Sequence, residues 1–225
     1  MNQLIQEVKL SPGEKISEEM LERLKEANEK YSSSKNFQQY LQNLAEIFKL
    51  SGELKIQTES KLFLAGFLEG EASLNVSAKK LKTATFGILL DPEFSLTQHV
   101  NGFSILFFAL QVFQTGRIRS KSGSHATLVF VIENRRSLEE KVIPFYKQYV
   151  APYGSTEKVR RLAKFERLLD LFNQGAHKQL DSFSNNMLPL WDEMRKQKGQ
   201  SNETFESLEE ARLFVREFDP NNKTK

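Results

Sequence analysis

The nine residues Leu64–Ala72, which read LAGFLEGEA, constrain the fold of this chain more than any other stretch. Apolar side chains before and within it recur at helical spacing, so the stretch predicts a helix. Gly66 and Gly70 lie four residues apart and share one face of that helix, where a second backbone can come very close. Ser60 is expected to cap the start of the helix, and Gly70 to stand near its end.

Two carboxylates, Glu69 and Glu71, stand at the end of this glycine-marked face. The helix dipole disfavours an acid at the C-terminal end by up to ~1 kcal/mol, and a bound divalent cation would remove that cost. The pattern alone also fits a buried helix whose glycines permit close packing and whose final glutamates are solvated. Both interpretations stay open at this point.

Composition and charge narrow the class of protein. The 225 residues contain no cysteine, which excludes a disulfide framework and a zinc site built on thiolates. No run approaches the ~20 apolar residues of a membrane span, and the N-terminus resembles neither a secretory signal nor a transit peptide. The net charge is only +3, but residues 61–150 carry 11 basic against 7 acidic side chains. This local positive excess favours an anionic partner.

The elements that follow the motif predict an α+β core. Alternation of polar and apolar residues predicts four strands, over residues 74–82, 86–97, 117–121 and 125–132. Asp91-Pro92 is expected to interrupt the second strand, because proline cannot donate to a central ladder. Helices are expected over 100–113 and 135–150. The order is therefore αββαββα, in which four antiparallel strands form one sheet with helices on one face.

Three segments are expected along the chain. Residues 1–58 form an N-terminal helical extension, residues 59–150 the core, and residues 151–225 a C-terminal helical extension. The first extension contains two predicted helices, one from Ser17 to about Lys30 and one from Phe37 to about Leu50. The N-terminal extension carries no recognisable chemistry. In the C-terminal extension, a predicted helix over residues 155–173 has a basic face that could reach the DNA backbone, although such a face is more often merely solvated. The sequence has no second copy of the LAGFLEGEA stretch.

The predicted strands share a polar face that suits nucleic acid. Alternation places ten side chains on it: Asn75, Ser77, Lys79, Glu93, Ser95, Arg117, Arg119, Lys121, His125 and Thr127. Such side chains can contact base edges and phosphates, and a twisted β-ribbon can enter a major groove. An ordinary solvated sheet face is the alternative, but three basic residues at period two with few acids opposite favour nucleic acid.

The nine-residue stretch resembles the signature helix of the LAGLIDADG homing endonucleases. Residues 64–71 fill its first eight positions, and Ala72 stands where the ninth is normally glycine. Three further stretches, DPEFSLTQHVNG, TGRIRSKSGS and RRSLEEKVIPFYKQYV, make the resemblance closest to single-motif enzymes. These enzymes are encoded by group I introns in algal chloroplast large-subunit ribosomal RNA genes. The resemblance covers residues 61 to about 149.

The resemblance implies a homodimer in which two signature helices cross and each subunit lays a four-stranded saddle on DNA. The implied interface residues are Leu62, Ala65, Gly66, Glu69 and Gly70. Glu71 matches the catalytic acid that binds metal, usually an aspartate, and Gly70 is expected beside it as a second ligand. Gln98 matches the polar residue that orders the attacking water, although a solvated glutamine at a strand end is the alternative.

Other active-site candidates are weaker. The family often adds a basic residue after the fourth strand, and Lys147 lies near that place, but the match is poor. His99, His125 and His177 share no spacing typical of metal ligands, so we expect structural or surface roles for them.

The implied activity is site-specific, Mg²⁺-dependent hydrolysis of both strands of a long pseudo-palindromic DNA duplex, leaving 3′ overhangs and promoting intron mobility. Two or more Mg²⁺ ions per dimer are expected, with Mn²⁺ as a substitute and no small-molecule cofactor. The expected location is the chloroplast. Two alternatives on the same fold are an intron RNA maturase and a DNA-binding regulator that does not cleave, and cleavage of duplex DNA separates them from a nuclease.

Overall fold

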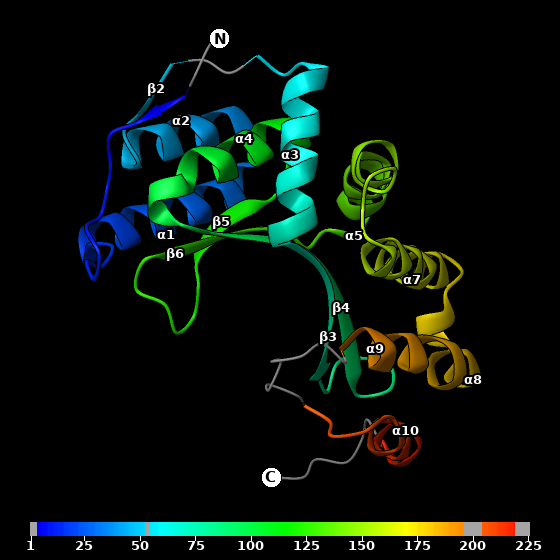
Figure 1. The fold of residues 1–225 in the computed structure, drawn as a ribbon. Helices are drawn as coiled ribbons and strands as arrows, with labels where there is room; N and C mark the ends of the chain where they lie inside the picture. Colours follow the sequence, from blue (N-terminus) through cyan, green and yellow to red (C-terminus); the bar gives the residue numbers. More distant parts are fainter. Residues whose placement is uncertain (1–3, 53–54, 196–203, 219–225) are drawn as a thin grey trace. The chain divides into compact units, whose positions relative to one another are not determined.

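The computed structural model describes residues 4–52, 55–195 and 204–218, which form two compact units (Figure 1). The first unit joins Met1–Ser73 to Phe94–Gly154, and the second joins Leu74–Glu93 to Ser155–Lys225. Both units are therefore discontinuous, and they cut across the three predicted segments because each extension packs with part of the core. Among the described residues, no helix is long and apolar enough to span a bilayer.

The predicted αββαββα order is confirmed. The signature stretch ends helix α3 (Thr58–Glu71), which is followed by strands β3 (Ala72–Lys80) and β4 (Ile88–His99). A short η1 turn (Val100–Gly102) leads into α4 (Phe103–Phe113), and then come β5 (Arg117–Ser120) and β6 (Thr127–Ile132). The four strands form one sheet in the order β3-β4-β6-β5.

Alternating burial fixes the register of this sheet. β4 pairs with β6 from Phe94 opposite Ile132 to His99 opposite Thr127, and Ile118 of β5 lies opposite Phe130 of β6. Phe94, Ile118 and Phe130 are fully buried, so a slip of one residue would turn these side chains to the other face. Helix α4 packs against β6 and covers the buried face of the sheet.

The predicted interruption at Asp91-Pro92 is wrong. β4 runs without a break from Ile88 to His99. The pairing of β4 with β6 starts at Phe94, so the first half of β4 has β3 as its hydrogen-bonded neighbour and tolerates a proline. The predicted third and fourth strands are also shorter than expected, because Lys121 and His125 lie in the turn between β5 and β6.

A helical stretch after β6 covers α3. It consists of four consecutive segments: α5 (Arg135–Ser137), η2 (Leu138–Val142), α6 (Ile143–Phe145) and η3 (Tyr146–Val150). The η2 and η3 segments have π-helical hydrogen bonding, which widens the helix locally. η3 packs against α3, and Tyr146 is only 1% exposed there.

The N-terminal helices protect an edge of the sheet. α1 (Glu18–Ser34) and α2 (Phe37–Ile47) lie in the chain between β1 (Ile5–Gln6) and β2 (Leu50–Ser51), which pair as a small sheet. Ser17 caps α1 as predicted, but the helix continues past Lys30 through three serines to Ser34.

Edge protection comes from two side chains of these helices. Tyr40 Oη accepts a hydrogen bond from the backbone N–H of Ile118, and Asn28 Nδ2 donates to the Ile118 carbonyl, both at 2.8 Å. Asn28 Oδ1 also accepts from Tyr40 Oη. The outer edge of β5 is thereby satisfied within the protein rather than left open to a second strand.

The second unit packs the 74–93 hairpin with the C-terminal helices. Those helices are α7 (Thr156–Asn173), η4 (Ala176–Lys178), α8 (Leu180–Ser182), η5 (Phe183–Met187), α9 (Leu188–Arg195) and α10 (Leu208–Glu217). Trp191 is 2% exposed and belongs to the core of this unit. Arg195 stacks on the Trp191 ring, pairs with Asp192 and donates to the Phe205 carbonyl, which ties α9 to the segment before α10.

Candidate active site and nucleic-acid interface

Glu71 is the last residue of α3 and is exposed. The helix forms because Leu64 and Leu68 are fully buried, each worth about 1.5–3 kcal/mol of apolar burial, and because its first turn is capped. In that cap the backbone N–H of Gln57 donates to Ser60 Oγ at 2.9 Å. The helix ends when Ala72 turns to an extended conformation while its N–H still donates to the Leu68 carbonyl. A rigid helix thus presents the Glu71 carboxylate at its C-terminal end.

Gln98 lies near the end of β4 and is half-buried. Its Oε1 accepts a hydrogen bond from the His99 N–H at 2.8 Å. Its side chain lies over Gly102, where an added Cβ would come within 2.8 Å of Gln98 Cγ. Gly102 therefore makes the room in which the Gln98 side chain sits.

Glu71 and Gln98 lie at the same end of the sheet. β3 starts directly after Glu71, and β4 ends directly after Gln98. The two strands are neighbours joined by a short hairpin loop, closed by the Leu81 N–H donating to the Gly87 carbonyl, so they run antiparallel. Both residues also belong to the first compact unit.

The donor chemistry at this end suits Mg²⁺. The ion takes oxygen ligands, keeps several waters, and is usually held by one or two carboxylates together with substrate phosphates. An exposed glutamate beside backbone carbonyls of a helix end offers such donors, with Gly70 next to Glu71. Across the described residues, no group of three or more His, Cys, Asp or Glu side chains could hold a metal ion.

Glu69 differs from Glu71 in its surroundings. It is half-buried, and its carboxylate raises the pKa of the Tyr146 hydroxyl in addition to the larger effect of burial. A Cβ added at Gly154 would lie 3.0 Å from Glu69 Oε2. Glu69 is therefore directed toward η3 and its following loop within the protomer, and we leave it out of the proposed interface.

One face of α3 is uncovered. Leu62 is 42% and Phe63 61% exposed, and a Cβ added at Gly66 or Gly70 would meet no atom within 4 Å. We call these four residues the open face of α3. Ala65 is only 3% exposed, so it packs inside the protomer and also drops out of the proposed interface. Phe63 was not predicted to lie on this face. Its position, next to Leu62 and three residues before Gly66, could have indicated that it does.

The strands have the predicted polar face, because buried and surface side chains alternate along them. Leu74, Val76 and Ala78 of β3 are buried, whereas the polar residues between them reach the surface. The predicted side chains that lie on strands and are exposed or half-buried are Asn75, Ser77, Lys79, Glu93, Ser95, Arg117, Arg119 and Thr127. Lys121 and His125 lie in the exposed turn between β5 and β6.

Several of these side chains have partners within the protein. Lys79 Nζ pairs with Asp91 at 2.8 Å, and Arg161 of α7 donates to the Asn75 side-chain oxygen at 3.1 Å. Arg161 also donates to the Leu74 carbonyl, and its burial lowers the pKa of its guanidinium. Asp91 and Arg161 were not predicted to belong to this face. Asp91 lies two residues before Glu93 on β4, so the alternation of the strand could have predicted that both lie on the same face.

Arg117 and Arg119 share one acid. Arg117 Nη2 lies 2.5 Å from Glu133 Oε2, and Arg119 Nη1 lies 3.2 Å from Glu133 Oε1. Both arginines also line a groove of about 1020 Å³ between α1 and β5. Glu133 was not predicted to be a site residue, because it follows the end of the last strand.

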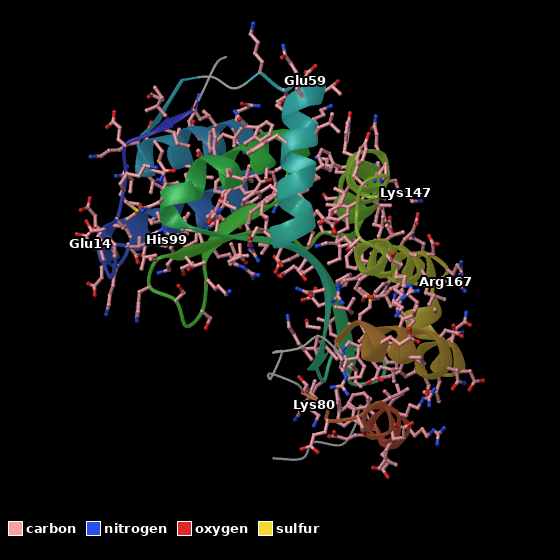
Figure 2. The ribbon with its side chains drawn as sticks, viewed as in Figure 1. Glu14, Glu59, Lys80, His99, Lys147 and Arg167 are labelled. Atoms are coloured by element: carbon pink, nitrogen blue, oxygen red, sulfur yellow. The ribbon has the colours of Figure 1, made fainter. Side chains whose placement is uncertain are left out.

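Two further candidates have positions that limit their roles. His99 Nδ1 accepts the Asn101 N–H and so caps the η1 turn, in keeping with a structural role (Figure 2). Lys147 is exposed on η3, the segment that packs against α3. Lys61 lies over the Tyr149 ring at 5.6 Å from its centroid.

Comparisons with known proteins agree with this geometry. A family model for LAGLIDADG endonucleases matches residues 64–168. The DNA endonuclease I-CeuI of Chlamydomonas moewusii is 58% identical over 209 residues, which span 93% of this chain and 95% of that protein. The solved structure of the group I intron-encoded homing endonuclease I-CeuI complexed with DNA superposes with a TM-score of 0.88 over 92% of this chain and 100% of that one.

A more distant structure shares the fold. The archaeal intron-encoded homing endonuclease I-Vdi141I complexed with DNA is 26% identical, with a TM-score of 0.62 over 70% of this chain and 95% of that chain. The fold, the signature helix and the similarity along nearly the whole chain lead to one assignment. The chain belongs to the LAGLIDADG family of homing endonucleases.

Proposed function

We propose that this protein is a site-specific endonuclease that hydrolyses one phosphodiester bond in each strand of a long DNA duplex. The observation that carries the proposal is Glu71, an exposed carboxylate held at the C-terminal end of the signature helix. An acid costs stability there unless a cation lies near it. The identity of 58% to a DNA endonuclease over 95% of that protein's length supports the same reaction.

The residues of this chain divide the work between holding and orienting. Glu71, with the neighbouring Gly70 carbonyl, would hold Mg²⁺ against a substrate phosphate. When bound, the ion supplies relief of charge on the leaving 3′ oxygen and activates the attacking water. Gln98 orients that water through its side-chain amide. Gly102 has no side chain and so leaves the space that the Gln98 side chain occupies.

Target recognition belongs to the polar face of the sheet. Arg117 and Arg119 are candidates for guanine contacts, because a guanidinium can donate to both O6 and N7. Lys79 and Lys121 are candidates for phosphate contacts, which position the duplex without reading its sequence. The DNA in the structure of the relative at 58% identity supports a duplex as the partner.

We further propose that two copies act together. One chain supplies one Glu71 and so serves one strand, whereas a C₂ dimer supplies two acids and recognises a pseudo-palindromic site. The open face of α3 would form the contact, because Gly66 and Gly70 let a second helix approach while Leu62 and Phe63 become buried. Cuts that leave 3′ overhangs, promotion of intron mobility and a chloroplast location remain proposals that rest on the family resemblance.

A cleavage selection tests the function. The full-length protein is incubated with a library of randomised DNA duplexes and Mg²⁺, and cleaved molecules are sequenced at both ends. We expect enrichment of one pseudo-palindromic site, cut on both strands, with no products in EDTA. Binding without cleavage would instead support the DNA-binding regulator, and stimulation of intron RNA splicing without DNA cleavage would support the maturase.

A further inference from the structure

Glu133 bridges the two arginines of β5. Its Oε2 accepts from Arg117 Nη2 at 2.5 Å, and its Oε1 accepts from Arg119 Nη1 at 3.2 Å. The strand register explains the reach, because Val131 lies opposite Arg117 and Glu133 is the next residue of the same parity. One carboxylate therefore fixes two guanidiniums that alternate along one strand.

This bridge adds little to the stability of the fold. The side chains of Arg117, Arg119 and Glu133 are 41%, 42% and 30% exposed. Ion pairs this exposed contribute little net stability, since solvent screens them. The strands beneath are held independently by Ile118 and Phe130, which are fully buried. The effect of Glu133 is therefore expected at the surface.

An acid at this place opposes unselective contact with DNA. Glu133 repels phosphates, and a guanidinium that turns toward a phosphate must leave its carboxylate. Guanine recognition instead needs a guanidinium held in the plane of the base. Nε of Arg117 is buried and makes no hydrogen bond within the described part of the chain, so its terminal nitrogens are the ones within reach of a base.

We propose that Glu133 is a positioning residue that sets sequence specificity. It holds Arg117 and Arg119 toward base edges and withholds both from phosphates. The inference rests on the proposed function, because it assumes that the polar face of the sheet reads DNA. It adds a residue that touches no DNA and acts only through the two arginines.

The test compares Glu133→Gln with a matched control, Glu140→Gln. The control removes the same charge from another ion pair, because Glu140 pairs with exposed Arg136 at 2.7 Å. Dissociation constants of the full-length protein are measured in a salt series for two duplexes. One is the duplex that the parent protein enriches from a randomised library, and the other is a scrambled duplex of the same length and composition.

We expect Glu133→Gln to bind the scrambled duplex about tenfold more tightly and the enriched duplex with little change, so that the preference falls about tenfold. The slope of log K against log salt for the scrambled duplex should steepen by about 1–2, because each new phosphate contact adds about 0.9. Glu140→Gln should shift both duplexes equally.

Two results overturn this inference. In one, Glu133→Gln and Glu140→Gln change the dissociation constants for both duplexes by the same factors. Glu133 would then act only through its contribution to the net charge. In the other, Glu133→Gln keeps its effect when Arg117 and Arg119 are both alanine. Failure of the proposed function looks different, since the parent protein would then enrich no duplex and cleave none, and that result overturns both proposals.

Discussion

The open face of α3 and the polar face of the sheet are both uncovered, but they treat their side chains in opposite ways. On α3, Leu62 and Phe63 face solvent, and Gly66 and Gly70 have open space where a side chain would lie. On the sheet, charged and amide groups are held by other residues of the same chain, as Lys79 is by Asp91. The first surface lacks contacts that only another molecule can supply, and the second is already satisfied in water.

This difference indicates different kinds of partner. An apolar face with two glycines gains most from a close and permanent contact, because burying Leu62 and Phe63 removes apolar area from water. Charges that are paired within the chain, such as Lys79 with Asp91, are satisfied whether or not DNA is present, so this face suits a contact that forms and dissociates. We therefore propose that α3 serves assembly and that the sheet makes a reversible contact with DNA.

The largest effect that would break this comparison is expected at Gly66. Gly66→Leu should leave the protomer folded, because a Cβ added at Gly66 meets no atom within 4 Å outside the backbone of its own helix. In a C₂ dimer the clash occurs twice, so at ~1–3 kcal/mol each the dimer should lose about 2–6 kcal/mol. Sedimentation equilibrium, with and without duplex DNA, measures the change.

The matched control is Ala163→Leu, an exposed position on α7. It adds a comparable side chain on another helix and should leave association unchanged. A parent protein that stays monomeric at micromolar concentration on and off DNA would refute the assignment of α3 to assembly. So would a Gly66→Leu variant that dimerises as the parent does.

A smaller effect is expected at Gly102, which sharpens the account of the active site. Its φ of −103° suits alanine, and the three atoms nearest to an added Cβ all belong to Gln98. Displacing the Gln98 amide by about 1 Å should slow cleavage about 10–100-fold, with DNA affinity unchanged. Single-turnover cleavage at saturating protein measures the rate.

The control makes the same substitution in a protein that lacks the Gln98 side chain. In a Gln98→Ala background, which is itself expected to be slow, Gly102→Ala should have no further effect. Equal slowing in both backgrounds would mean that Gly102 acts on the fold rather than on Gln98. A Gln98→Ala variant that cleaves at the parent rate would remove Gln98 from the mechanism.

Arginine and lysine should differ on the recognition surface. Arg119→Ala is expected to relax base preference at one position of each half-site, at a cost of ~1–3 kcal/mol. Lys121→Ala should weaken binding to all sequences and reduce the salt slope by about 1. Competition binding against single-base variants of the site distinguishes the two. Identical behaviour of both variants and the parent would show that this face does not read DNA.

Much of the fold was predictable because it depends on local patterns. The helical spacing within residues 58–71 and the alternation on β3 and β6 reflect burial on one side, which sequence periodicity reports directly. Capping by Ser17 is likewise local, since its side chain accepts the N–H of Met20 three residues on. The positions of Glu71 and Gln98 at element ends followed from the same patterns together with the family resemblance.

What the sequence did not predict depends on contacts between distant residues. The bridge from Glu133 to two arginines requires the β5–β6 register, and the contact of Arg161 with β3 requires the packing of α7. Pro92 was misread because its tolerance depends on where β6 begins to pair with β4. Ala65 was misplaced because helical spacing alone does not say how wide the covered side of a helix is.

Substitution of Glu71 tests the central claim most directly. Glu71→Gln keeps the shape of the side chain and removes the charge at the end of α3, so the variant should fold, dimerise and bind its target as the parent does. Mg²⁺-dependent cleavage should fall by at least ~100-fold on both strands, because a required metal ligand is lost. Glu69→Gln, directed toward η3, is the matched control and should still cleave. Cleavage by Glu71→Gln at the parent rate would contradict the account.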